Sequence, residues 1–175
     1  MSRMRIDYAG VSLVELLVTI TIVGILTAIA LPNFQTWIRN ARIRTTAEAV
    51  TNGLQLARSE AVRRNTNVQF ALNADTSWTV GCVNVVDNGV VGVDDTVGDC
   101  PAAIQSRSKG EGSANVLITA TTVVFNGFGR AANATVDVTD AGGGTGLHPL
   151  RVTVASGGGV KLCDPSVGAG DPRVC

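Results

Sequence analysis

The amino-acid sequence predicts an α+β protein, in which one long N-terminal helix packs on an antiparallel β-sheet. Two observations lead to this fold class. An uncharged apolar run and then an amphipathic stretch with helical spacing come first in the chain, and short segments of alternating apolar and polar residues fill most of the rest. A helix followed by strands, without alternation of the two, is typical of α+β domains. The 175 residues give room for one globular domain and an appendage.

The first element is an apolar run over residues 16–38, which contains no charged side chain. About 20 apolar residues are enough to cross a bilayer as a helix. Arg3 and Arg5 precede the run and place the N-terminus in the cytoplasm by the positive-inside rule, so we expect the globular domain on the other side of the membrane. Glu15 stands at the start of the run, where a bare carboxylate is costly and needs a partner.

A secretory signal peptide is an alternative interpretation of the same run. Residues 28–30 have the small-x-small pattern that signal peptidase cuts, so cleavage after Ala30 would release a soluble exported domain. The apolar run does not stop at Ala30, however, and continues through Phe34 and Trp37 into a helical stretch. Cleavage there would cut a continuous helix, and we therefore favour a membrane anchor.

The second element is an amphipathic spine helix over residues 39–65. Six apolar residues follow one another at spacings of three and four, which places them on one face of a helix: Ile43, Ala47, Val50, Leu54, Ala57 and Ala61. The opposite face is rich in arginine, and we interpret it as a solvated face. Asn65, Thr66 and Asn67 are expected to end the helix.

The remaining elements are strands in a β-rich globular domain over residues 66–175. Val68, Phe70 and Leu72 alternate along the first of them. Further strands are expected at residues 78–86, 116–118, 122–125, 135–139, 150–155 and 160–163. The glycine-rich patches between them match no phosphate-binding pattern and are interpreted as turns.

Four cysteines lie in this domain, at positions 82, 100, 163 and 175. No CxxC spacing and only one histidine, His148, argue against a zinc site. An even count in a chain that looks exported favours disulfides instead. Proximity in the sequence favours Cys82 with Cys100 and Cys163 with Cys175 over the other two connectivities. The second of these bridges would tie down the C-terminal tail.

Composition narrows the possible functions. Charged residues make up 16 % of the chain and the formal net charge is +0, so overall charge does not attract a polyanion and any charged partner must be bound locally. With a single histidine, no Ser-His-Asp arrangement can be argued. We find no catalytic constellation, and expect neither an enzyme nor a cofactor.

The N-terminal segment carries a family resemblance. Gly10 followed by VSLVELLVTITIVGILTAIALPNF is similar to the class III signal and N-terminal helix of type IV pilins and type II secretion pseudopilins. The resemblance implies a pilin-like fold, a leader at residues 1–10 that prepilin peptidase removes, methylation of the new N-terminus at Val11, and a transmembrane and filament-core helix at residues 11–38. Val11 departs from the phenylalanine that the family usually has.

The same resemblance assigns roles within that helix. Glu15 becomes the fifth residue of the mature chain, where its carboxylate can be neutralised by the amino terminus of a neighbouring subunit in the filament. Pro32 removes one helix hydrogen bond and falls at a position where helices of this family loosen. The implied partners are other pilins or pseudopilins, prepilin peptidase and the bacterial inner membrane.

Two further segments resemble the GspH/FimT group within this family: LQLARSEAVRRNTNVQFAL, residues 54–72, and VVFNGFGR, residues 123–130. The tail, KLCDPSVGAGDPRVC, looks more like the FimT-type minor pilins than the secretion pseudopilins. The implied function is that of a minor pilin in a type IV pilus. An H-type pseudopilin of the type II secretion system is the alternative.

DNA uptake is a further hypothesis that the resemblance raises. Some FimT-like minor pilins bind DNA through a C-terminal GRxR-like motif, and the matching place here has Gly159 for the first arginine and Lys161 for the second. Lys161, Arg151 and Arg173 are the candidate phosphate contacts, with two aspartates of the tail opposing them. The alternative interpretation is a few ordinary surface charges on a disulfide-tied tail.

Overall fold

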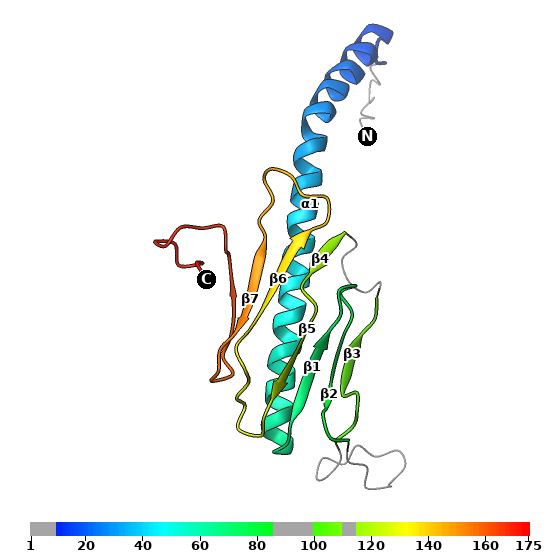
Figure 1. Ribbon diagram of the computed structural model, residues 1–175. Coiled ribbons are helices and arrows are strands. Elements are labelled where there is room, and N and C mark those ends of the chain that lie inside the picture. Colours follow the sequence, from blue (N-terminus) through cyan, green and yellow to red (C-terminus); the bar gives the residue numbers. More distant parts are fainter. Residues whose placement is uncertain (1–9, 86–99, 110–114) are drawn as a thin grey trace, which may run out of the picture. The chain divides into compact units, whose positions relative to one another are not determined.

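The computed structural model describes residues 10–85, 100–109 and 115–175, apart from the side chain of Pro32. Helix α1 (Leu13–Arg64) comes first (Figure 1). The strands follow in this order: β1 (Val68–Leu72), β2 (Trp78–Cys82), β3 (Gln105–Arg107), β4 (Val116–Ile118), β5 (Thr121–Phe125), β6 (Ala134–Asp140), β7 (Leu150–Val154) and β8 (Val160–Cys163). The predicted order of one helix and then antiparallel strands is confirmed.

The chain forms two compact units, Met1–Trp37 and Ile38–Cys175. Helix α1 ends in the second unit at Arg64, close to its predicted end, because Asn65 adopts a left-handed φ of 48°. The Thr66 N–H then donates to the Ala61 carbonyl at 3.2 Å, which satisfies one of the last helical acceptors.

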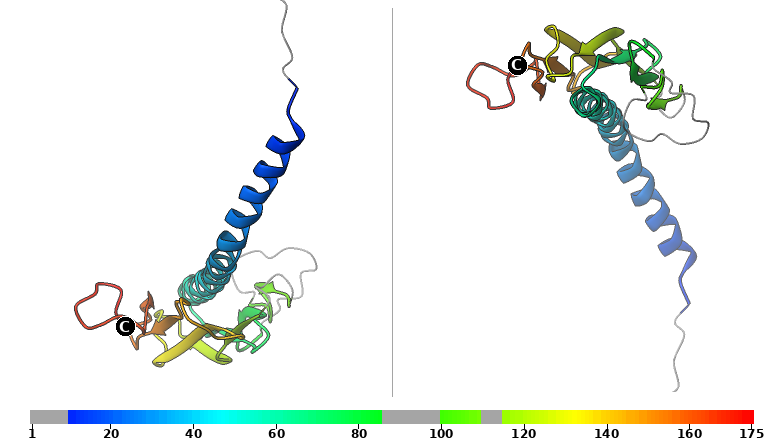
Figure 2. Two further views of the ribbon diagram at one scale, coloured as in Figure 1. Left: turned by 90° about the horizontal axis from the view of Figure 1, so that it is seen from above. Right: turned by 90° about the horizontal axis from the view of Figure 1, so that it is seen from below.

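The second unit contains two antiparallel four-stranded sheets and not the single sheet that the sequence suggested. Their strand orders are β3-β2-β1-β5 and β4-β6-β7-β8. After β4, which belongs to the second sheet, two residues lead the chain into the first sheet as β5. Both sheets lie on the same side of the C-terminal half of α1 (Figures 1 and 2).

Strand ends lie close to their predicted positions, with two exceptions. The ends of β5, β6 and β7 differ from the prediction by one residue. Strand β3 was not predicted, because its three residues are polar and partly or fully exposed and so give no apolar alternation. Strand β2 stops at Cys82, earlier than expected, and the far end of that predicted segment lies outside the described residues.

The core of this unit lies between the spine part of α1 and the inner faces of both sheets. All six residues of the predicted apolar stripe are buried, which confirms the helical face. They share the core with Phe70, Phe125, Val136, Val138 and Val152. Gly53 lets the helix approach the sheet closely, since a Cβ at this position would stand 2.5 Å from the Phe70 ring.

The arginine-rich face of the spine helix is not simply solvated, and the prediction was wrong for Arg39 and Arg64. Arg39 binds Asp140, whereas Arg58 stays exposed while it donates to the Gly129 carbonyl at 3.2 Å. The side chain of Arg64 is only 3 % exposed and binds Glu60 at 2.9 Å. The helical spacing showed which residues face the core but not which polar groups of the sheets meet the flanks of the helix.

Candidate assembly segment and tail site

The described part of the chain begins at the predicted cleavage site. Gly10 and Val11 are both exposed and precede the first residue of α1, so the peptide bond between them lies outside the helix. A Cβ built on Gly10 meets no other atom within 4 Å. The chain itself therefore does not require glycine here. Residues 1–9 of the predicted leader, with Arg3 and Arg5, lie outside the described residues.

Ser12 caps the helix, a role that the sequence analysis missed. The Glu15 N–H donates to the Ser12 Oγ at 3.1 Å, and the Leu16 N–H donates to the Ser12 carbonyl at 3.1 Å. A serine followed three residues later by glutamate, just before an apolar run, is the sequence signature of such a cap. Glu15 thus occupies the first turn of α1, where the helix dipole also favours a negative charge.

The rest of this unit presents an apolar surface. From Gly10 onward, where the structure describes this unit, the large apolar side chains are all half-exposed or more: Val11, Leu13, Val14, Leu16, Leu17, Val18, Ile20, Ile22, Val23, Ile25, Leu26, Ile29, Leu31, Phe34 and Trp37. Glu15 is the only charged residue between Val11 and Ile38. By length and composition, α1 contains one segment that could cross a membrane.

The hydroxyl groups within this apolar surface are satisfied by the helix itself. Thr19 donates to the Leu16 carbonyl, and Thr21 donates to the Val18 carbonyl. Thr27 donates to a carbonyl four residues earlier, at 2.7 Å. Such bonds remove the cost of placing a hydroxyl in an apolar environment. The helix continues through Pro32, which has no N–H to donate to the carbonyl of residue 28.

In the second unit, Arg39 and Asn40 hold the loop that follows β6, and we call this contact the Arg39–Asn40 clamp. The Arg39 guanidinium binds both carboxylate oxygens of Asp140, and its Nη2 also donates to the Gly143 carbonyl at 2.6 Å. The Asp140 side chain is 3 % exposed. The hydrogen bonds from Arg39 lower the pKa of the Asp140 carboxyl below its ordinary value, against the opposing effect of burial.

Asn40 completes the clamp from the next position of the helix. Its amide donates to the Gly146 carbonyl at 2.9 Å, and its side-chain oxygen accepts from the His148 N–H at 2.9 Å. The one histidine of the chain therefore lies beside a structural contact. The clamp was not predicted, since its partners are more than 100 residues apart in the sequence and no local pattern links them.

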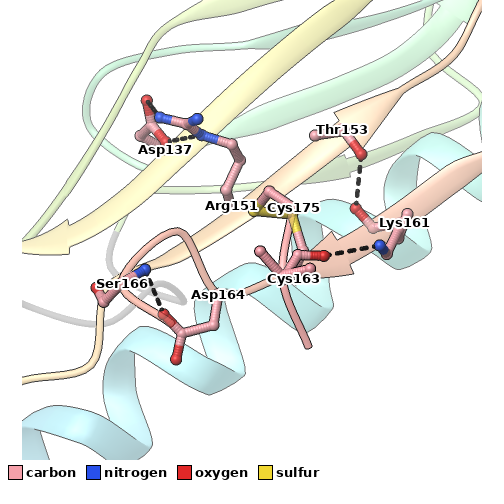
Figure 3. The surroundings of a disulfide bond; sticks show 9 residues. Asp137, Arg151, Thr153, Lys161, Cys163, Asp164, Ser166 and Cys175 are labelled. Atoms are coloured by element: carbon pink, nitrogen blue, oxygen red, sulfur yellow. Dashed lines mark hydrogen bonds and ion pairs between the residues drawn. A yellow bond between two sulfur atoms is a disulfide. The ribbon is translucent and has the colours of Figure 1, made fainter. Parts of the chain in front are cut away.

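The C-terminal tail is held by a disulfide, which Figure 3 shows, and by backbone hydrogen bonds. Cys163, at the end of β8, is bonded to Cys175, and the Asp164 N–H donates to the Arg173 carbonyl at 2.8 Å. The other disulfide joins Cys82 to Cys100. These are the two pairings that sequence proximity favoured.

The three candidate DNA contacts each have a partner within the protein. Arg151 binds Asp137 through two hydrogen bonds, of 2.6 and 3.2 Å, and the Lys161 ammonium donates to the Val174 carbonyl at 2.8 Å (Figure 3). Arg173 binds both carboxylate oxygens of a neighbouring aspartate in the tail.

That neighbouring aspartate is Asp171, and its pairing with Arg173 shifts the pKa of both groups. Hydrogen bonds from the side chain and backbone of Arg173 lower the pKa of Asp171 to about 2, and the same pair raises the pKa of Arg173. Both side chains are therefore charged at neutral pH. Across the described residues, no group of three or more side chains is arranged to hold a metal ion.

Comparison with known proteins identifies the family. Residues 46–158 match the family model described as type II transport protein GspH, and residues 6–31 match the prokaryotic N-terminal methylation motif. The chain belongs to the GspH family. The two matched regions contain the buried stripe of α1 from Ala47 onward, the strands through β7, Gly10 and Glu15.

Two solved structures share the fold of this chain. The type IV minor pilin FimU of Pseudomonas aeruginosa superposes with a TM-score of 0.51 at 16 % identity, covering 71 % of this chain and 92 % of that one. The minor pseudopilin EpsH of the Vibrio cholerae type 2 secretion system superposes with a TM-score of 0.50 at 14 % identity, covering 72 % of this chain and 99 % of that one. The predicted pilin-like fold is confirmed. No curated protein matches the sequence.

The GspH assignment makes this chain a minor pilin or pseudopilin, in a family of structural subunits and not of enzymes. It also supports the prediction that prepilin peptidase and other pilins are partners. The two superpositions are equally good and both fall well below 25 % identity, so they show the fold and do not choose between the two machines.

Proposed function

We propose that this protein is a minor pilin of a type IV pilus, cleaved after Gly10 and held in the inner membrane by the apolar part of α1 until it enters the filament. The observation that carries the proposal is the exposed apolar surface between Val11 and Trp37 with its single charge at Glu15. Exposing such an apolar surface to water is unfavourable, whereas contact with lipid or with the helices of other pilins is favourable. The globular domain then lies in the periplasm.

Glu15 supplies the specific contact in this proposal. After cleavage the new amino terminus at Val11 is a cation, and a neighbouring subunit can bring it to the Glu15 carboxylate. A buried pair of opposite charges sets the register of packing more than it adds net stability. A helical filament needs such a register, because each subunit must have the same axial offset from its neighbour.

Processing after Gly10 is tested by the mass and N-terminal sequence of the mature protein. A chain that begins at a methylated Val11 supports the proposal. A chain that begins at Leu31 would show instead that signal peptidase cuts after Ala30 and releases a soluble domain. The family match to the methylation motif ends at residue 31 and so includes both sites, which makes the measurement decisive.

The choice of a pilus over a secretion machine rests on the tail, KLCDPSVGAGDPRVC, which resembles those of FimT-type minor pilins. An H-type pseudopilin shares the cleavage, the anchor and the fold, and it is the second candidate. Deletion of the gene distinguishes the two. Loss of surface pili with normal protein secretion supports the minor pilin, whereas normal pili with a secretion defect supports the pseudopilin.

DNA binding is not part of the proposed function. Arg151 and Arg173 are paired with the carboxylates of Asp137 and Asp171, whereas Lys161 donates to the Val174 carbonyl and keeps its positive charge. A phosphate contact at either arginine would first have to displace a carboxylate, and Lys161 alone supplies only one charge. Proteins that bind DNA without sequence preference depend instead on several cations free to replace counterions.

A further inference from the structure

A pocket with a volume of about 470 Å³ lies where the spine part of α1 meets the second sheet and the C-terminal tail. Helix α1 contributes Asn40 and Arg44, the loop after β6 contributes His148, and the tail contributes Arg173. Asp164, directly after β8, also lines the pocket. The volume falls within the ~300–1,000 Å³ range that is typical of sites for small molecules.

Asp164 brings to this pocket a buried carboxylate with one oxygen unused. The residue is 5 % exposed, and its Oδ1 accepts from the Ser166 N–H at 2.8 Å (Figure 3). Among the described residues, no group donates to its Oδ2. A buried carboxylate oxygen without a donor is costly, so this position favours a cationic donor that enters the pocket.

Two guanidinium groups of the lining keep unused donors. Arg44 binds Glu48 through its Nε, at 2.8 Å, and its two terminal amino groups have no partner among the described residues. Arg173 binds Asp171 through Nε and Nη2, which leaves its Nη1. Arginine holds phosphate groups through such N–H donors. The pocket therefore offers an acceptor to a cation and donors to an anion.

The remaining wall of the pocket is apolar. It is formed by Leu150, Leu162 and Pro172, beside the sulfur of Cys163. A wall of this kind favours contact with hydrocarbon. The matching ligand is thus a zwitterion whose ammonium and anionic groups are joined by a short hydrocarbon linker.

The pocket lies at the end of the second unit at which α1 enters it. Asn40 and Arg44 follow Trp37, the last residue of the exposed apolar segment, by three and seven residues. The Arg39–Asn40 clamp holds the loop after β6 at the same end (Figure 1). Tryptophan is enriched at the level of the lipid headgroups, and cations just beyond a spanning segment meet those headgroups. In an anchored chain, the zwitterions nearest to this pocket are therefore lipid headgroups.

We propose that this pocket binds the headgroup of a phosphatidylethanolamine lipid, with the ammonium at Asp164 and the phosphate at Arg44 and Arg173. The primary ammonium has N–H donors for the unused Oδ2 of Asp164, and the ethylene linker lies against the apolar wall. The inference rests on the proposed function in one respect, since it requires that the chain is anchored in a membrane.

Hydrogen–deuterium exchange of the full-length protein in lipid nanodiscs tests the proposal. One set of nanodiscs contains phosphatidylglycerol and phosphatidylethanolamine in equal parts. The matched set contains phosphatidylcholine in place of phosphatidylethanolamine, because its methylated ammonium has no N–H donor. We expect phosphatidylethanolamine to slow exchange of the His148, Asp164 and Ser166 N–H groups about fivefold, as for a site about four-fifths occupied. Equal exchange in the two sets would overturn the proposal.

Soluble glycerophosphoethanolamine distinguishes a lipid from a free solute with the same chemistry. At ~1 mM in the phosphatidylcholine nanodiscs it should protect these groups much less, because it lacks the high local concentration that a membrane provides. Protection equal to that by phosphatidylethanolamine would overturn the assignment to a lipid.

Two matched variants locate the effect. Asp164→Asn should abolish the difference between the two lipids, since an amide can still accept from the Ser166 N–H but carries no charge. Asp75→Asn is the control, because Asp75 accepts from the Ser77 N–H in a similar turn outside the pocket. Near-identical thermal unfolding of both variants and the parent protein shows that they fold. A lipid effect that persists in Asp164→Asn, or that is lost equally in both variants, would overturn the proposal.

Failure of this inference is distinguishable from failure of the proposed function. A chain that does not enter nanodiscs, or whose mature form begins at Leu31, contradicts the membrane anchor and so overturns both. A chain that enters nanodiscs but shows no protection by phosphatidylethanolamine overturns the headgroup site alone.

Discussion

Glu15 has two separable roles within the first turn of α1. Its backbone N–H is bound by the Ser12 hydroxyl, and its carboxylate is the only charge between Val11 and Ile38. The cap stabilises the start of the helix in one subunit, whereas the carboxylate acts between subunits in the proposed function. Substitutions at the two positions can therefore distinguish a folding defect from an assembly defect.

Glu15→Leu should still insert in the membrane, yet enter filaments poorly, because the partner of the neighbouring amino terminus is gone. Ser12→Ala is the matched control. It keeps the charge but loses the cap, at a cost of about 1 kcal/mol in helix stability, and should assemble nearly normally. The measurement is the amount of each variant in sheared filaments relative to membranes. Equal incorporation of Glu15→Leu and the parent protein would contradict the assembly role.

Gly10→Ala should leave the leader attached, as judged by the mass of the protein recovered from membranes. A Cβ at Gly10 meets nothing within 4 Å, so the chain tolerates alanine and any effect must come from the peptidase. Gly24→Ala, which is equally open inside α1, is the control and should be processed normally. Normal processing of Gly10→Ala would exclude the class III signal.

At the scale of elements, the Arg39–Asn40 clamp fixes the loop after β6 against the spine helix. Asp140→Asn should lower the free energy of unfolding by about 1.5–3 kcal/mol, because hydrogen bonds to a buried charged group are lost. Glu48→Gln removes an exposed pair with Arg44 on the same helix and should cost under about 1 kcal/mol. Chemical denaturation of the full-length protein in micelles measures both. Similar values for the two variants would show that the clamp adds no stability.

The clamp also predicts a pH dependence. Arg39 lowers the pKa of Asp140 in the folded state below its ordinary value of 3.8, so the unfolded chain takes up a proton at higher pH than the folded chain. The contribution of the pair is therefore complete above about pH 4 and is lost as the pH falls through the folded pKa. Asp140→Asn should weaken the fall in melting temperature below that pH. An unchanged acid profile would contradict this assignment.

The elements show which features the sequence could predict. The buried stripe of the spine helix was predictable, because spacings of three and four report directly on one helical face. Strand positions followed from alternation in the same way. The separation into two sheets was not predictable, since alternation shows which face of a strand is buried but not which strand lies beside it. The clamp has the same origin, as it arises from a pairing between distant segments.

The site shows the same limits. Gly10, Glu15 and the cysteine pairings lie in local patterns, and so the sequence could propose them. Ser12 also lay in a local pattern, the capping box, and was overlooked because Glu15 was considered only as a charge. The two opposing aspartates of the tail were noted in the sequence, and one of them, Asp171, does bind Arg173. The partner of Arg151 could not be foreseen, because Asp137 meets Arg151 only through the register of β6 and β7.

At the scale of the whole molecule, the two units have opposite surface chemistry. The unit that ends at Trp37 exposes its large apolar side chains, and the unit that begins at Ile38 buries most of its own in a core shared by a helix and two sheets. A subunit that must be held in an apolar environment and also present a folded domain to water needs both. The division agrees with the proposed function.

The tail of the molecule should be separable from its core. Replacing Cys163 and Cys175 by serine should make trypsin cut faster after Arg173, because the disulfide and the bonds around Asp164 that hold the tail are weakened together. The sheets should survive, since the closed loop is short and terminal. Replacing Cys82 and Cys100 by serine is the control and should not speed this cut. Global unfolding of the first variant would show that the tail is part of the core.

The threonine hydrogen bonds inside the apolar part of α1 affect how easily this segment could move between the membrane and a filament. Because Thr19, Thr21 and Thr27 each donate to a carbonyl of their own helix, these three side chains bring no unsatisfied hydroxyl to whatever surrounds them. Lipid tails and the flanks of neighbouring helices then become nearly interchangeable solvents for it, and moving from one to the other costs little. The difference between lipid and filament then comes from Glu15, whose carboxylate can find a partner in the filament. In the proposed function, the pairing of Glu15 favours entry into the filament. The rest of the segment has nearly the same free energy in the filament and in the membrane, so return to the membrane stays possible.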